Sequence, residues 1–374
     1  GSSFVNAGAD MRTISTDDIE SIEVVRGIPS VEYGDLTSGL VSVKRKQGGR
    51  DIEARFKADM QSKLFYTGKG FEWGERDKLT MNVNAGYLNA MSDPRNTRQN
   101  YSRLTAGYRI GKRWTVLDGL EFSVNGNMDF TGSFDNRKSD KDLDRGLGSR
   151  PIEIYKSEYN KIVVGAVFGV KNRVETGFFR QFMLTTSLTA EFDEISRWKY
   201  VVLGSTVPLS TALTEGEHDA LIVPSRYEAT LKVDGKPFYA YVKALSKFRV
   251  KTPSMTHDFK IGTDWNMDKN YGKGVIFDPH HPFSPDMNVR PRRFSSIPAI
   301  HHISAFTEVS SKWNIGVFRL ETMLGIRATS MINIEKEYSI QGSIYTDPRL
   351  NVRLEFPAIN IGGSKLVAAL SGGA

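Results

Sequence analysis

Apolar and polar residues alternate one by one along segments of this chain that are unusually long. In residues 120–130, "LEFSVNGNMDF", apolar residues and one glycine fill the even positions, and polar residues fill the odd ones. Residues 182–192 and 259–267 show the same alternation. Successive side chains of a strand point to opposite faces, whereas a helix cannot place every second residue on one face. These segments are therefore predicted to be strands with one apolar face.

The predicted strands are longer than those of ordinary globular proteins. They run for about 10–13 residues, against an average of about 5–6 in globular folds, and a tilted strand needs about 9–11 to cross a bilayer. We expect roughly eleven or twelve such strands. They are placed at 51–60, 64–72, 78–90, 101–110, 118–131, 158–170, 179–193, 237–250, 257–267, 299–310 and 318–330, with a shorter one at 349–356.

The expected connections alternate between short and long. Short turns are predicted near 111–117, 171–178, 251–256 and 311–317, and long polar connections near 131–157, 194–236 and 268–299. Long loops on one rim and short turns on the other are typical of a transmembrane barrel, and a soluble sandwich has no reason to separate them. Aromatic residues near strand ends fit interfacial girdles, with ordinary packing as the alternative: Tyr87, Tyr101, Trp198, Tyr200, Trp265 and Trp313.

Composition excludes several other classes of protein. No apolar run approaches the roughly 18 residues of a membrane helix, so a helical membrane protein is excluded. The absence of cysteine rules out disulfides, thiolate metal sites and a cysteine nucleophile. The net charge of +7 arises from basic residues scattered among 43 acidic ones, which indicates a solvated surface rather than a nucleic-acid interface.

The two ends of the sequence predict a piece of a longer protein. The start, "GSSFVNAGADMRT", lacks the charged and apolar regions of a signal peptide. The end, "NIGGSKLVAALSGGA", lacks a terminal strand signal. We therefore expect both ends to be cuts within a longer chain.

A distinctive hairpin precedes the alternating strands. Residues 17–46, "DDIESIEVVRGIPSVEYGDLTSGLVSVKRK", predict a strand, a turn rich in glycine and proline, and a second strand that ends in positive charge. The stretch resembles the end of the plug domain of TonB-dependent outer-membrane receptors, which carry a strand of the form "IESIEVLRG", then "YG", then a glycine turn and a basic strand end. The residues that match this plug motif are Arg26, Gly27, Tyr33, Gly34 and Gly39.

Local chemistry agrees with this hairpin. Gly27 and Gly34 permit tight turns, and Pro29 fixes the backbone φ between them. The alternating apolar residues of the two strands are expected to bury one face of a small sheet: Ile22, Val24, Val41 and Val43. The three basic residues 44–46 are expected to stay on the periplasmic side.

The resemblance implies an all-β fold in two parts. Residues 1–48 would be the C-terminal part of the plug, and residues 49–374 the N-terminal half of a transmembrane β-barrel that is incomplete in this chain. "SAFTEVSSKWN" (304–314) and "DPRLNVRLEF" (347–356) resemble barrel segments of the family. "GIPSVEYGDLTSG" is similar to Bacteroidetes receptors with a carboxypeptidase-like regulatory extension. It departs from the starch-utilisation type, in which an Ala-rich segment precedes "YG".

The resemblance also implies a function. It predicts active import of a ligand across the outer membrane of a Gram-negative bacterium, without a cofactor and without catalysis. The implied partners are TonB, through a box that this chain lacks, an extracellular nutrient ligand, outer-membrane lipid and lipopolysaccharide, and a surface lipoprotein; nucleic acid is not among them. On the barrel strands, Val124 would face lipid and Asn125 the lumen.

Two alternatives stay open at this point. One is a non-transport outer-membrane barrel, either an adhesin or a barrel hydrolase; a hydrolase should show a histidine and a carboxylate near the outer rim, and the sequence has no nucleophile-elbow motif. The other is a soluble all-β binding module. It would be monomeric and soluble without detergent.

Metal and ligand sites have only weak sequence signals. Asp140, Asp142 and Asp144 alternate as calcium ligands can, but Gly146 comes one place late and Pro151 takes the place of the bidentate glutamate, so a solvated loop is the simpler interpretation.

Two histidine pairs, 280–281 and 301–302, suggest metal, but adjacent residues on a strand point to opposite faces, so each pair would offer one ligand per face. The first pair lies in "DPHHPFSP", which is more simply a loop stiffened by proline. Candidate ligand contacts in the long loops are Phe134, Asp135 and Tyr155.

Overall fold

The computed structural model describes most of the chain. The described residues are 19–25, 28–34, 40–60, 62–75, 77–90, 100–117, 119–139, 153–174, 177–210, 212, 215–285, 291–357, 359–361, 364–366 and 369–373. All regular elements among them are strands. No helix in this part of the chain is long and apolar enough to cross a membrane.

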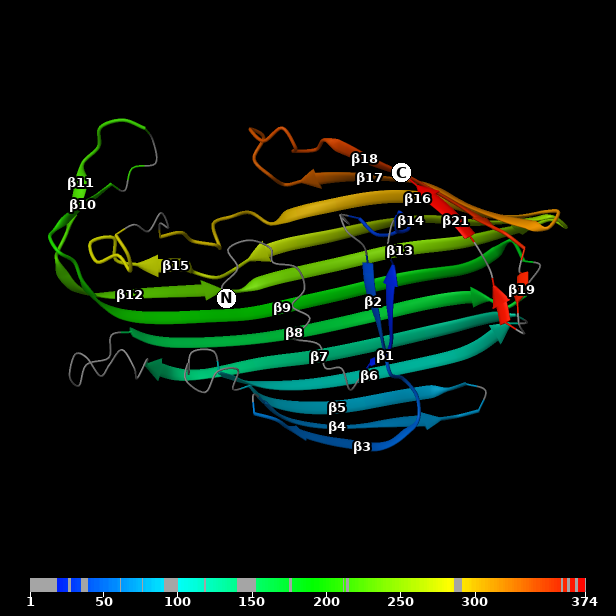
Figure 1. The fold of residues 1–374 in the computed structure, drawn as a ribbon, viewed down its shortest axis with the longest axis horizontal. Coiled ribbons are helices and arrows are strands. Elements are labelled where there is room, and N and C mark those ends of the chain that lie inside the picture. The colour runs from blue at the N-terminus through cyan, green and yellow to red at the C-terminus, as the bar shows by residue number, and fades with distance from the viewer. Residues whose placement is uncertain are drawn as a thin grey trace.

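One large antiparallel sheet dominates the structure, and Figure 1 shows its long strands lying side by side on a curved surface. Its strands follow one another in chain order, each paired with the next, from β3 at one edge to β21 at the other. They are β3 (Arg50–Ala58), β4 (Ser62–Trp73), β5 (Leu79–Ala90), β6 (Tyr101–Leu117), β7 (Leu120–Ser139), β8 (Glu153–Asn172), β9 (Phe179–Val202), β13 (Pro237–Lys251), β14 (Met255–Asn270), β16 (Ile300–Ile315), β17 (Phe318–Ile332), β18 (Ile344–Glu355) and β21 (Ala369–Gly373).

Smaller strand pairs accompany this sheet. β12 (Arg226–Gly235) pairs with the far end of β9 and with β15 (Gly274–Phe277). Three two-stranded sheets stand apart: β1 (Ile19–Val25) with β2 (Leu40–Arg45), β10 (Val207–Ser210) with β11 (Ala220–Val223), and β19 (Ile359–Ile361) with β20 (Ser364–Leu366). β1 and β2 cross in front of the long strands in Figure 1.

The all-β prediction is confirmed, and each of the twelve predicted strands has a counterpart. Several strands are longer than predicted. The turn expected at 111–117 is wrong, because these residues continue β6 and pair with β7, so that Trp114 lies opposite Phe122. Residues 311–315 likewise belong to β16. The long loop expected at 194–236 is also wrong, because β9 continues to Val202 and β12 returns along it.

The middle of the large sheet has an apolar outer face. One row across β5 to β9 consists of residues that are directly paired and about 40–50% exposed: Val83, Tyr108, Met128, Val164 and Leu188. A soluble protein rarely leaves such a contiguous apolar surface open. The opposite face is polar, and some of its polar side chains are buried. Asn82 and Arg109 are paired there and are only 6% and 4% exposed, and Arg109 forms an ion pair of 2.7 Å with Asp129.

The polarity reverses at one end of the sheet. Beyond Asp193, Arg197 and Lys199 of β9 still point inward, but Ile195 and Val201 of β9 and the inward side chains of β12 are apolar and buried. They form a core with β15 and the loop that follows it: Ile195, Val201, Val223, Tyr227, Ala229, Leu231, Val233, Val275 and Phe283. The outward residues of β12 (Arg226, Glu228 and Thr230) are exposed. We call this part, formed by β9 from residue 194 onward together with β10–β12, β15 and the loop to residue 285, the rim extension.

The rim extension is also held by polar contacts. The Arg197 guanidinium lies over the Phe283 ring at 4.4 Å and donates to Glu153. The Tyr227 hydroxyl donates to the Pro282 carbonyl at 2.8 Å. His281 hydrogen-bonds Asp278 and, with the backbone N–H of His280, holds the pKa of that carboxyl below its usual range. These contacts fix the loop over the apolar core.

The prediction for the β1–β2 hairpin is only half right. The two strands pair, and the four apolar residues share one face as expected, with Ile22 opposite Val43 and Val24 opposite Val41. Their apolar face is not buried: Ile22 is 54% and Val24 56% exposed. The reason is that no other described element packs against this face, so two strands alone have nothing to cover it.

Aromatic side chains cluster near the short turns. Trp114 stacks on Phe122 with ring centroids 6.1 Å apart, and Phe122 lies 6.4 Å from Phe168. All three belong to the outward face near the ends of β6, β7 and β8. Among the aromatic residues expected at strand ends, Tyr87 is 44% exposed, whereas Trp265 stacks on His301 at 5.8 Å. This aromatic cluster consists of residues that the sequence analysis did not single out, and the expected girdle stays a prediction.

Candidate functional site

A short loop between β1 and β2 rests on the polar inner face of the large sheet. We call residues 28–34 the seated loop, and the strands beneath it, β13, β14, β16, β17 and β18, the inner wall. Val31 is fully buried and packs against Leu245 of β13 and Phe306 of β16, with Met183 beside them. Val31 and these three side chains thus form a small apolar cluster on a wall that carries many charged residues.

Glu308 of β16 is the central hydrogen-bond acceptor of this contact. The Ser30 hydroxyl donates to Glu308 Oε2 at 2.5 Å, and the Val31 backbone N–H donates to the same oxygen at 3.1 Å. Lys260 of β14 forms an ion pair with Glu308 at 2.8 Å and also donates to Ser30 Oγ at 3.1 Å. Since Glu308 is 2% exposed, these bonds are shielded from solvent and are stronger than surface contacts.

Two arginines of the wall bind the backbone of the loop. Arg349 of β18 donates to the Ser30 carbonyl at 2.9 Å and to the Pro29 carbonyl at 3.2 Å. Arg327 of β17 lies near the Val31 carbonyl, with a distance of 3.4 Å from Nη1 to the oxygen. Because these bonds use backbone carbonyls, they fix the course of the loop whatever side chains it carries.

The last part of the loop is held by Lys243 of β13. Its ammonium donates to Glu32 at 2.8 Å and lies 5.3 Å from the centre of the Tyr33 ring. Lys243 and Glu32 are 11% and 10% exposed, so this is a nearly buried pair that joins the loop to the wall. Burial raises the pKa of the Tyr33 hydroxyl, and the charges of Glu32 and Glu23 raise it further.

The structure gives Gly34 a different role from the one predicted. A Cβ at this position would lie 2.7 Å from Nε of Arg327, so the glycine lets the backbone pass directly beside a guanidinium. Its importance is close approach rather than a special turn conformation. Tyr33 and Gly34 of the plug motif therefore both belong to the contact with the wall, whereas Arg26, Gly27 and Gly39 lie outside the described residues.

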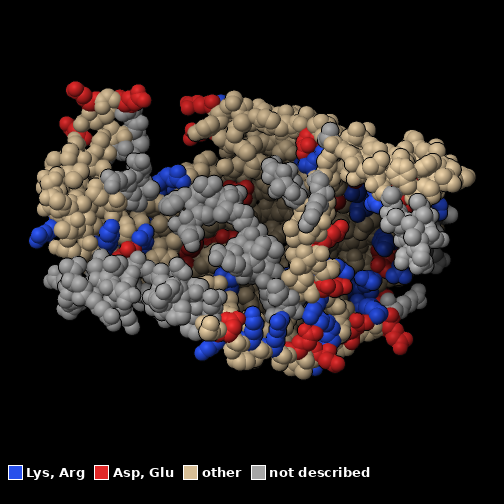
Figure 2. Space-filling view, in the orientation of Figure 1, with Lys and Arg blue, Asp and Glu red and all other residues tan. Residues whose placement is uncertain are grey.

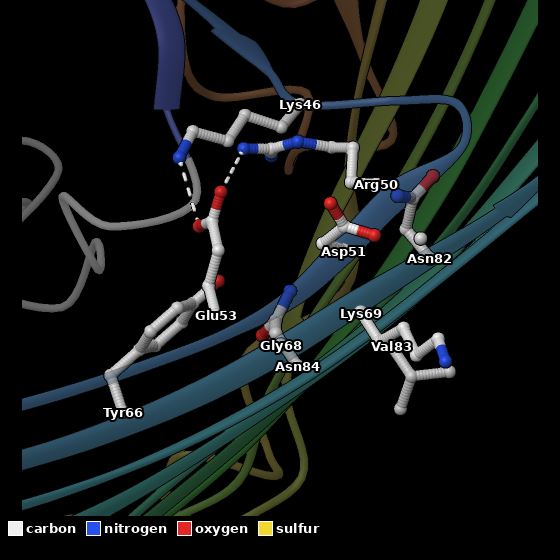
Figure 3. A pocket seen from close by; sticks show the side chains of 11 residues that line it. Lys46, Arg50, Asp51, Glu53, Tyr66, Gly68, Lys69, Asn82, Val83 and Asn84 are labelled. Atoms are coloured by element: carbon white, nitrogen blue, oxygen red, sulfur yellow. Dashed lines mark hydrogen bonds and ion pairs between the residues drawn. The ribbon is translucent and has the colours of Figure 1, made fainter.

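The connection from β2 to the large sheet is fixed to β4 and β5 (Figure 3). Lys46 and Arg50 both point toward the Glu53 carboxylate and form ion pairs with it. Asn82 bonds the backbone of Gly48 in both directions, accepting from its N–H at 3.1 Å and donating to its carbonyl at 3.0 Å. Gly48 has φ of 99°, a conformation suited to glycine. Basic and acidic side chains gather over β3–β5, as Figure 2 shows along the lower edge of that view.

The weak metal and ligand candidates gain no support. Asp140, Asp142 and Asp144 lie outside the described residues, and so do the side chains of Phe134 and Asp135. Tyr155 packs against the core of the rim extension. No group of three or more His, Cys, Asp or Glu side chains is arranged to hold a metal in the part of the chain that the structure describes.

The two histidines at 301–302 do point to opposite faces, as predicted. His301 contacts Trp265, and His302 lies 2.8 Å from Asn266 Oδ1.

The residues of the inner wall were missed by sequence reasoning. Glu308, Lys260, Arg327, Arg349 and Lys243 sit at alternating polar positions that look no different from those of any other strand. A usable signal was present, because the wall strands β13–β18 carry charged residues at mid-strand on the side opposite the apolar face. That signal predicts a charged inner face of the sheet, but it does not predict which charged residues contact the loop.

Comparisons with known proteins agree with this fold. No protein-family model and no curated protein matches the chain. Among solved structures, the closed form of the ferric-catecholate import receptor Fiu from E. coli K12 matches with a TM-score of 0.53 and 11% identity, over 91% of this chain and 53% of that one. The copper transporter OprC matches with a TM-score of 0.53 and 11% identity, over 97% of this chain and 50% of that one.

These matches show a similar fold, but at 11% identity they do not show a relationship in sequence. The chain shares the fold of these two solved proteins over the part that it covers. It spans about half the length of the solved chains that it matches.

Proposed function

We propose that this chain is part of a TonB-dependent receptor that imports a ligand across the outer membrane of a Gram-negative bacterium. Residues 1–48 are the end of its plug, and residues 49–374 are the first half of its transmembrane barrel. The observation that carries the proposal is the combination of an exposed apolar row on the outside of the sheet with a buried charged wall that holds a loop on the inside. Strands that cross a bilayer need this inverted arrangement.

The two alternatives explain less of the structure. A soluble binding module would have to leave the row from Val83 to Leu188 in water. An adhesin or a barrel hydrolase has no need for a loop that seals its interior through a fully buried valine. Import requires such a loop, because the path must be closed at rest and opened when a ligand is transported.

The partners follow from this proposal. TonB would pull on the plug from the periplasm, a nutrient ligand would enter from outside, and lipid and lipopolysaccharide would surround the barrel. A surface lipoprotein and a Bacteroidetes origin with a carboxypeptidase-like regulatory extension fit the hairpin sequence. Fiu is described as a ferric-catecholate receptor and OprC as a copper transporter, so a ferric catecholate complex and Cu²⁺ are reasonable first probes for transport.

The proposal can be tested without knowing the ligand. In the intact receptor in its own outer membrane, Val31→Asp places a charge between Leu245 and Phe306 and should release the seated loop. Cells should then become sensitive to vancomycin, which is too large for ordinary porins. Ile22→Asp, on the exposed face of β1, is the matched control and should leave resistance unchanged.

If the Val31→Asp receptor is present in the membrane at normal abundance and the cells stay resistant to vancomycin, the proposed role of the loop is contradicted. A receptor that fractionates with soluble protein would contradict the proposal as a whole.

A further inference from the structure

The inner wall keeps most of its charges paired without help from the seated loop. Three ion pairs, at 2.8, 2.8 and 2.5 Å, lie entirely within the sheet: Lys260 with Glu308, Arg327 with Asp264, and Arg349 with Asp347. When the loop leaves the wall, these pairs lose hydrogen bonds to the loop but keep their opposite charges. Since an unpaired buried charge is costly, a wall paired in this way can be uncovered and covered again.

Lys243 is different, because its acidic partner is Glu32 of the loop. No acid of the described sheet forms an ion pair with it. The Tyr33 ring, its other contact, also belongs to the loop. Departure of the loop therefore removes both contacts at once and leaves a lysine ammonium on the uncovered wall.

Lys247 adds a second positive charge at the same place. It lies four residues further along β13, on the same face as Lys243 and Leu245. Glu32 and Glu308 are the acids whose charges act on it, and no described acid forms an ion pair with it. Glu32 thus balances a patch of two lysines while the loop is seated.

We propose that Lys243 exchanges partners during transport: it pairs with Glu32 in the closed state and binds an anionic group of the ligand once the loop has left the wall. A carboxylate, phosphate or catecholate oxygen would restore the charge balance that Glu32 provided, with Lys247 beside it. This inference rests on the proposed import function. It adds that the ligand carries negative charge and passes along β13 rather than along the β3–β5 side, where the connection to the hairpin stays fixed by Asn82 and Glu53.

A charge swap separates this role from simple structural pairing. In the double variant Glu32→Lys with Lys243→Glu, the pair between loop and wall is kept, but the uncovered wall presents an acid. The matched control is Lys161→Glu with Glu191→Lys, a pair at 2.8 Å whose two members both belong to the sheet. Lys247→Gln removes one of the two lysine charges without touching the pair.

The measurement uses the intact receptor in planar bilayers of phosphatidylethanolamine and phosphatidylglycerol. The urea concentration is raised until the plug leaves the wall and a current flows. The probe ions are K⁺ and Cl⁻ in a KCl gradient. The parent receptor should prefer Cl⁻, and citrate, as a carboxylate probe, should reduce its current. The swap should shift the reversal potential toward K⁺ and lose the block by citrate; Lys247→Gln should shift it partly in the same direction, and the control swap should not.

The outcomes distinguish this inference from the function on which it rests. An unchanged reversal potential in both the Glu32/Lys243 swap and Lys247→Gln would overturn the role of Lys243, while the proposed import function would stand. If the swap leaks before urea is added, Lys247→Gln decides the question on its own. If no variant conducts at any urea concentration that leaves the barrel folded, the plug does not leave the wall, which would overturn the proposed function and this inference with it.

Discussion

The first half of β9 and the strand β12, which pairs with its far end, carry their apolar side chains on opposite faces of the sheet. In the first half, Leu188 and Phe192 point outward and are 50% and 46% exposed. In β12, which pairs with β9 beyond Asp193, the alternate residues 227–233 point inward and are apolar and buried, together with Ile195 and Val201 of β9. The outward Arg226, Glu228 and Thr230 of β12 are exposed. β9 itself runs through both regions without interruption.

The difference shows what lies outside each of these two regions of the sheet. Apolar side chains are placed where water is absent, so an outward apolar face requires a cover that the described chain does not supply, whereas the rim extension carries its own core. On the proposed function, that cover is lipid around the middle of the sheet, and the rim extension stands in water beyond it. The reversal near Asp193 then marks the outer boundary of the membrane.

The largest loss of stability should come from truncating a side chain in the core of the rim extension. Leu231, which is 7% exposed, packs within the apolar cluster. Leu231→Ala should cost about 2–5 kcal/mol of local stability, because it removes buried methyl groups and leaves a cavity. Hydrogen exchange of the β12 amides in the intact receptor measures this loss. Leu188→Ala is the matched control on the same sheet, and an equal effect there would mean that protein, not lipid, covers both sites.

How far the sequence could predict this fold is clearest from the same two regions. The alternation in residues 182–192 indicated both the strand and its apolar face, because one side chain in two carries the pattern. Residues 194–236 were predicted to be a long polar loop, although β12 alternates as regularly. Its inward residues include alanine and tyrosine, its outward ones are charged or polar, and the window from 203 to 225 separates it from β9. The pairing of β12 with β9 is a long-range contact that no local pattern reveals.

Of the contact between the seated loop and the inner wall, only residues of the loop could be predicted from the sequence. Tyr33 and Gly34 were singled out by resemblance, and both lie against the wall. Glu32, between the valine and the tyrosine, was not, because a lone glutamate in a loop looks like a solvated charge. Lys243 gave no signal either, since its meaning depends on an acid that is 211 positions away in the sequence. Contacts between a loop and a distant strand are set only when the loop packs onto the folded sheet.

A charge on the outward face gives the second test of the comparison. Leu188→Arg, at the β9 end of the row across β5–β9, should cost about 2–4 kcal/mol, since an arginine near the bilayer centre must leave water. Thr230→Arg, on the exposed face of β12, should change stability by less than about 0.5 kcal/mol. Urea unfolding of the intact receptor in lipid vesicles provides both values. If the two variants lose the same stability, the reversal of polarity has nothing to do with a membrane.

The smallest effect is expected at Val124, and it would locate the second boundary of the membrane, near the short turns. Val124 points outward, as expected, but it lies only four residues after the start of β7 and beside Phe122 in the aromatic cluster near the short turns. An arginine there can reach the headgroups, so Val124→Arg should cost only about 0–1 kcal/mol, well below Leu188→Arg. The same vesicle unfolding experiment ranks the two, with the inward Asn125→Arg as the control for a change of charge on this strand. A cost at Val124 as large as at Leu188 would place the boundary beyond the turn between β6 and β7, and the stacked Trp114 and Phe122 would then lie in the hydrocarbon rather than at its edge.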